Sequence, residues 1–93
     1  MERTYRGVRY TSLVASDVQR DGIGLELHWH SGSQAQVVAE VFFSDETGAW
    51  TVNTFDCDIP LELLEELIVE AKSRLGKEEP NQPVQTRPTS RPV

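Results

Sequence analysis

A carboxylate and two imidazoles occur at alternate positions in the first half of the chain, at Glu26, His28 and His30. Alternate residues of a strand point to one face, and two imidazoles with a carboxylate are common ligands of catalytic zinc and iron. The neighbouring strand is expected to offer Gln34 and Gln36 there, which are poor metal ligands. A metal- or ligand-dependent enzyme or sensor is therefore an alternative to two half-exposed histidines on a sheet, and no cofactor is predicted.

The single cysteine gives weaker support for catalysis. Cys57 precedes an expected helix, whose dipole can lower a thiol pKa. Its neighbours Asp56 and Asp58 oppose this effect, because adjacent carboxylates disfavour a thiolate. The paired carboxylates Glu65 and Glu66 are neighbours on a helix rather than partners across a cleft. These patterns predict that the protein is not an enzyme.

Four predicted strands position these side chains. The clearest is residues 23–30, where apolar and polar residues alternate strictly, as in a strand with one buried face. The other predicted strands are residues 8–14, 36–44 and 49–55, separated by turn residues at 16–22, 31–33 and 45–48. A three-residue loop pairs Leu27 with Val37, and a four-residue loop pairs Phe43 with Trp50. The result is an antiparallel four-stranded β-meander.

A C-terminal helix is expected to cover the apolar face of this meander. Asp58 is the expected N-cap, Pro60 lies in the first turn, and Gly76 is placed to end the helix. Apolar residues repeat at helical spacing along one stripe: Leu61, Leu64, Leu67, Ile68, Ala71 and Leu75. The expected fold is therefore α+β in the order ββββα, as one domain over residues 1–76. Residues 77–93 contain four prolines and few large apolar side chains, which predicts a disordered tail.

Three apolar side chains are expected on the sheet face that the helix does not cover. The predicted register groups Val38, Phe42 and Phe55 on the central strands, with Glu40 and Asn53 beside them. An uncovered patch of this kind is typical of an interface. The alternative is that the N-terminal segment or the tail covers it. These five residues are the candidates for a protein interface.

Charge is distributed unevenly along the chain. The 93 residues carry 15 acidic and 9 basic side chains, a net charge of −6, and residues 21–70 contain 11 acidic side chains with no Lys or Arg. Such a field repels phosphate backbones, so nucleic acid is not predicted as a partner. An acidic mimic of nucleic acid that blocks a basic partner is a further alternative.

The leading hypothesis combines these features. No run of about 18 apolar residues is present to cross a bilayer, and the first residues lack the apolar core of a secretory signal, so a cytoplasmic protein without membrane contact is expected. The sequence predicts a small non-enzymatic module that binds a protein partner, or a second copy of itself, through an exposed sheet face and an acidic surface.

Overall fold

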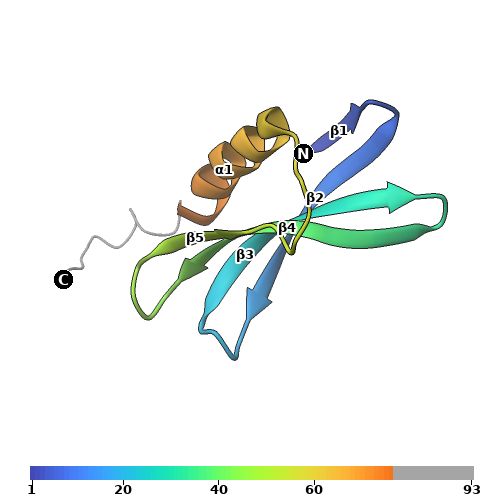
Figure 1. Cartoon of the computed structure of the whole chain (residues 1–93). Helices are drawn as coiled ribbons and strands as arrows, with labels where there is room; N and C mark the ends of the chain where they lie inside the picture. The colour runs from blue at the N-terminus through green and yellow to red at the C-terminus, as the bar shows by residue number, and fades with distance from the viewer. Residues whose placement is uncertain (77–93) are drawn as a thin grey trace.

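The computed structural model describes residues 1–76 as one antiparallel sheet with a helix against one face (Figure 1). The elements in chain order are β1 (Glu2–Tyr5), β2 (Val8–Asp17), β3 (Gly22–Ser31), β4 (Gln34–Ser44), β5 (Trp50–Asn53) and α1 (Leu61–Leu75). The α+β class and the C-terminal helix are confirmed, whereas the predicted number of four strands is wrong. The predicted disordered tail, residues 77–93, lies outside the described residues. Within residues 1–76, no helix has the length and apolar character needed to cross a bilayer.

The strand that the sequence pattern did not predict is β1. Arg6 and Gly7 have φ angles of 51° and 80°, and a two-residue type I′ turn requires positive φ at both central residues. This turn folds β1 back onto the first residues of β2. Three of the four β1 residues are exposed, so the segment lacks the apolar alternation that marks a strand with one buried face.

The register of β3 with β4 differs from the prediction by two residues from Gly22 to Leu27, and by one residue from His28 to Ser31. Leu27 pairs with Ala39 rather than with Val37. The hairpin turn contains two residues instead of three, and a β-bulge after Leu27 leaves Val38 without a partner on β3. The even shift keeps Leu25 and Leu27 opposite core residues of β4, whereas the odd shift next to the turn places Val37, not Gln36, opposite His28.

The core lies between α1 and the predicted apolar face of the sheet. Leu25 and Leu27 of β3 and Leu67 of α1 are fully buried. On β4, Val41 joins this cluster, and it pairs with Val52 of β5 as predicted. The alternation of apolar residues in β3 therefore identified the correct face.

The helix begins later than predicted and buries a slightly different stripe. Pro60, not Asp58, occupies the N-cap position, and no side chain caps the helix. A residue that precedes proline is disfavoured in helical conformation, which explains why the helix begins only after Pro60. Leu63 is buried in place of Leu61, whose side chain is 66% exposed. The helix ends at Gly76 as predicted.

Glu70 connects the helix to the N-terminal end of the sheet. Its carboxylate accepts hydrogen bonds from the Ser12 hydroxyl at 2.9 Å, from the α-amino group of Met1 at 3.2 Å and from Arg74 at 2.7 Å. Burial by itself raises the pKa of Glu70. The hydrogen bonds from Arg74, Ser12 and the α-amino group outweigh burial, and the pKa lies below its ordinary value of 4.5.

This lowered pKa predicts a pH-dependent contribution to stability. A carboxyl whose pKa is lower in the folded state stabilises the fold above its ordinary pKa of 4.5, and that stabilisation is lost as the pH falls through the folded-state value. We expect Glu70→Gln to lower the Tm at about pH 7, with a deficit that shrinks below about pH 4.5. Thermal unfolding followed by circular dichroism measures both effects.

Glu65→Gln is the matched control, because Glu65 lies at an exposed position of the same helix. This control variant should unfold like the wild type throughout the pH range. If the Tm of the Glu70→Gln variant lies as far below that of the wild type at about pH 3 as at about pH 7, the carboxylate charge does not stabilise the fold.

Candidate functional site

The two histidines of the predicted metal site have different hydrogen-bond partners. His28 Nε2 lies 3.0 Å from Oε1 of Glu26, whereas His30 Nε2 lies 2.8 Å from the hydroxyl of Thr11 on β2. Among the described residues, no group of three or more His, Cys, Asp or Glu side chains is arranged to hold a metal ion. Glu26 and His28 therefore form a hydrogen-bonded pair, and His30 has a separate partner.

Cys57 lies in the connection from β5 to α1 and packs against the core. Its side chain is partly buried and contacts the core cluster, and its backbone N–H donates a hydrogen bond to the carbonyl of Thr54 at 2.9 Å. A thiol in apolar surroundings is typical of a packing residue rather than of a nucleophile.

Phe42 is buried, although it lies on the sheet face opposite the helix. Only 6% of its surface is exposed. The absent side chain of Gly22 makes room for the ring, because a Cβ at that position would lie 2.4 Å from Cζ of Phe42. The guanidinium carbon of Arg20 lies 4.0 Å from the ring centroid and covers it. The predicted exposure of Phe42 is therefore wrong, because the turn between β2 and β3 places Arg20 over the ring.

Carboxylates on two strands hold Arg20 in this position. Its Nη2 donates hydrogen bonds to both oxygens of Glu40, at 2.8 and 3.1 Å, and its Nε donates to Asp17. The hydrogen bond with Glu40, followed by the one with Asp17, raises the pKa of Arg20 above its ordinary value. Glu40 is 5% exposed, so the carboxylate of this interface candidate already has a partner inside the protein.

Val38 contributes to the core on the helix side. Val38 is the extra residue of the β-bulge, so its side chain does not follow the strict alternation of side-chain direction along the strand. It belongs to the same cluster as Leu67 and Ala71. Its side chain is 5% exposed. The predicted exposure of Val38 is also wrong, because a bulge cannot be read from the period-2 pattern.

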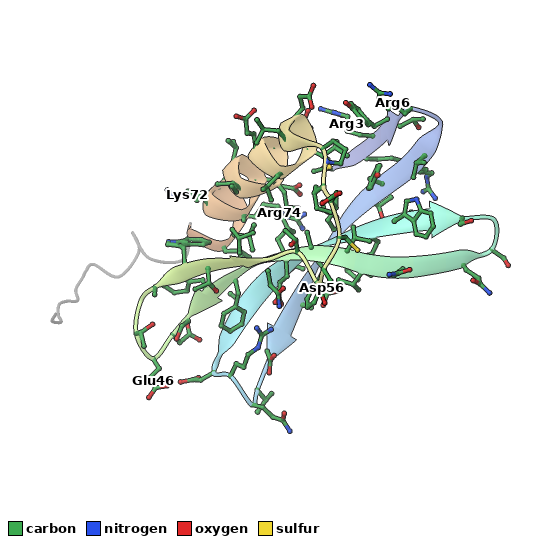
Figure 2. All side chains as sticks on the ribbon, viewed as in Figure 1. Arg3, Arg6, Glu46, Asp56, Lys72 and Arg74 are labelled. Atoms are coloured by element: carbon green, nitrogen blue, oxygen red, sulfur yellow. The ribbon has the colours of Figure 1, made fainter. Side chains whose placement is uncertain are left out.

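The remaining candidates, Asn53 and Phe55, form an exposed turn at the end of β5. The backbone N–H of Phe55 donates a hydrogen bond to Oδ1 of Asn53 at 2.9 Å. The hydrogen bond from Cys57 to Thr54 closes a β-turn whose central residues, Phe55 and Asp56, have φ angles of 52° and 62°. Figure 2 shows Asp56 on the connection that leads from β5 towards α1. Phe55 is 44% exposed.

The backbone of this turn is strained. Positive φ costs a residue with a Cβ about 1 to 2 kcal/mol, and Asn-Gly is the usual pair at the centre of a type I′ turn. The conformation persists because Asn53 is fixed in the sheet on one side, and Cys57 and Ile59 pack against the core on the other. Strain of this kind is concentrated at functional sites. Here it presents the aromatic ring of Phe55 at the protein surface.

Beside this turn, β4 loses its outer neighbour. Strand β5 pairs only with residues 40–43 of β4. In the described part of the chain, residues 34–39 have β3 as their one neighbouring strand. Figure 1 shows the hairpin of β3 and β4 extending past the end of β5 and away from α1. The sequence did not reveal this, because the predicted last strand continued to Phe55 along β4.

The turn of this hairpin determines which backbone groups face outward. Ser31 and Gln34 flank the two-residue turn, and such flanking residues exchange both hydrogen bonds. The pattern alternates along the ladder, so the N–H and C=O groups of Ala35 and Val37 point away from β3. We call residues 34–37 of β4 the open edge. Gln34, Ala35 and Gln36 are exposed.

An acidic groove lies between the N-terminal residues and α1. Its volume is about 620 Å³, and its lining residues are Met1, Arg3, Glu62, Glu65, Glu66, Val69, Glu70 and Ser73. Arg3 forms an ion pair with Glu66 at 3.0 Å, and Figure 2 shows Arg3 close to the first turns of the helix. The four glutamates of this groove belong to α1 and to the acidic segment of residues 21–70.

The comparisons with known proteins complete this description of the surface. The chain matches no protein-family model, no curated protein and no solved structure.

Proposed function

We propose that this protein is a cytoplasmic, non-enzymatic module that binds a protein partner through the open edge and the adjacent turn of Phe55. The observation that carries the proposal is the exposed ring of Phe55, held on a strained turn at the point where β4 loses its neighbour. Aromatic side chains are frequent anchors of protein interfaces. Asn53 takes part as the residue that fixes the turn.

The open edge supplies the second half of the recognition. Unpaired N–H and C=O groups on an edge strand form a template to which another extended segment can add. In such complexes the backbone hydrogen bonds provide affinity, and side-chain contacts provide specificity. A segment bound along β4 would end against the turn of Phe55, so one partner would contact both features.

The roles of the five interface candidates divide accordingly. Val38, Glu40 and Phe42 stabilise the fold that presents this surface. Phe55 contacts the partner, and Asn53 positions Phe55. The acidic side of α1 is a separate surface that suits a basic partner, because opposite charges steer association.

The test compares two lysine substitutions at exposed apolar residues. Phe55→Lys should weaken partner capture roughly tenfold or more, because removal of an interface anchor typically costs about 2 kcal/mol. Val18→Lys is the matched control, since Val18 is 91% exposed on the turn between β2 and β3. Quantitative mass spectrometry measures how much of each protein from the native host is captured by the wild type and by each lysine variant. In a second experiment, a photo-crosslinking residue at position 55 or 18 identifies the protein that contacts each position.

Circular dichroism should show the wild-type fold in both variants. Equal capture by the wild type and Phe55→Lys, or identical crosslinked products from positions 55 and 18, would refute the assignment of this surface.

A further inference from the structure

We infer that the open edge binds the open edge of a second copy of this chain, in antiparallel orientation, to form a two-fold symmetric dimer with a continuous sheet. The inference rests on the proposed function and names the partner. A dimer of this kind is isologous, because each copy contributes the same surface.

The backbone of the open edge is complementary to itself. The outward N–H and C=O groups belong to Ala35 and Val37, with Gln36 between them. If Gln36 lies opposite Gln36 of the second copy, Ala35 lies opposite Val37 of the second copy, and each such pair can exchange both backbone hydrogen bonds. The side chains of the two Gln36 residues are then cross-strand neighbours, at a distance suited to an amide–amide hydrogen bond.

The charge distribution favours this surface for self-association. The protein has a net charge of −6, so two copies repel each other over most of their surfaces. Residues 27–39 contain no Asp, Glu, Lys or Arg. They form the end of the hairpin that carries the open edge. Two copies can therefore approach here without bringing like charges together.

Edge strands of natural proteins normally carry features that prevent such pairing. Charged side chains, especially lysine, and proline are the usual ones. Residues 34–37 contain neither. The bulge at Val38 bends the strand only beyond this segment, and it limits the pairing to the end of the hairpin.

The symmetric register also gives Phe55 a contact. With Gln36 at the two-fold axis, the hairpin turn of the second copy reaches the point where β5 ends. The turn of the second copy consists of Gly32 and Ser33, and it would lie beside Phe55 and Asp56. Both segments are already ordered in the monomer, so dimerisation orders little additional chain.

The interface is small, and a weak dimer is expected. Interfaces below about 1,200 Å² are typical of transient complexes. We expect a dissociation constant on the order of 100 µM. Sedimentation equilibrium of the wild type from about 10 µM to about 1 mM should then show the mass rising from 10.5 kDa towards twice that value.

Charge substitutions at Gln36 test the symmetric register. Gln36→Lys and Gln36→Glu each place like charges opposite each other across the axis, and each should weaken self-association roughly tenfold or more. An equal mixture of the two variants places opposite charges there and should restore dimerisation to at least the wild-type level. Gln36 is exposed, so circular dichroism should show an unchanged fold.

Thr51→Lys and Thr51→Glu are the matched controls, because Thr51 is an exposed strand residue on β5. Each control changes the net charge by the same amount as the corresponding substitution at Gln36. These controls should associate like the wild type. A wild type that stays at 10.5 kDa at about 1 mM, or a Gln36→Lys and Gln36→Glu mixture that stays monomeric, overturns the inference.

The crosslinker at position 55 separates this inference from the proposed function. A crosslinked product of two copies of this chain supports both. A product with a different protein supports the proposed function and overturns the inference. Absence of any product from position 55 contradicts both.

Discussion

Leu67→Ala is expected to lower the free energy of unfolding by about 3 to 5 kcal/mol. Leu67 is fully buried between α1 and the sheet, and it belongs to the cluster that contains Leu25 and Leu27. Truncation removes its apolar contacts and leaves a cavity that a close-packed core fills only in part. A domain of this size has a total stability of about 5 to 10 kcal/mol, so the variant should be close to unfolding.

Leu61→Ala provides a matched control for this measurement. Leu61 lies in the same helix, but its side chain is 66% exposed, and the change in unfolding free energy should stay within about 0.5 kcal/mol. Urea denaturation of both variants gives the two values. Equal losses at Leu67 and Leu61 would mean that the helix presents a different face to the sheet.

Phe42→Ala is expected to cost about 3 to 5 kcal/mol, although Phe42 faces away from the helix. The ring fills the space above Gly22 and lies under Arg20. Its removal would expose this part of the sheet and leave Arg20 without its aromatic contact. Phe42→Lys should unfold the protein, because it also places a cation beside the guanidinium of Arg20.

The corresponding change at Phe55 serves as the comparison. Phe55→Ala should cost less than about 1 kcal/mol in stability, because the ring is 44% exposed, while it should weaken association with a partner. Urea denaturation and sedimentation measure these two effects separately. A stable Phe42→Ala variant would contradict the burial of Phe42 and restore it as a surface residue.

The main elements of the fold follow from local patterns in the sequence. The alternation of Leu25 and Leu27 with polar residues identified β3 and its buried face. The helical spacing of Leu67, Ala71 and Leu75 identified the buried side of α1. These patterns are informative because burial depends on side-chain direction, which repeats every 2 residues in a strand and about every 3.6 in a helix.

The details that decide the candidate site were less predictable. The bulge that turns Val38 inward depends on the length of the hairpin turn and on the register along the whole ladder. The position of β1 depends on positive φ at Arg6, a conformation that non-glycine residues adopt only occasionally. The end of β5 at Asn53 depends on the strained turn that follows it.

Sequence periodicity alone therefore distinguished the buried from the exposed face of β3 and of α1 from Leu67 onward, because this distinction reflects the direction of each side chain along its own backbone. It did not show that Arg20 lies over Phe42 or that residues 34–37 lack an outer strand. Those features depend on contacts between residues distant in sequence, and only the tertiary structure brings such residues together. The burial of Phe42 and the open edge beside Phe55 are both consequences of that long-range arrangement.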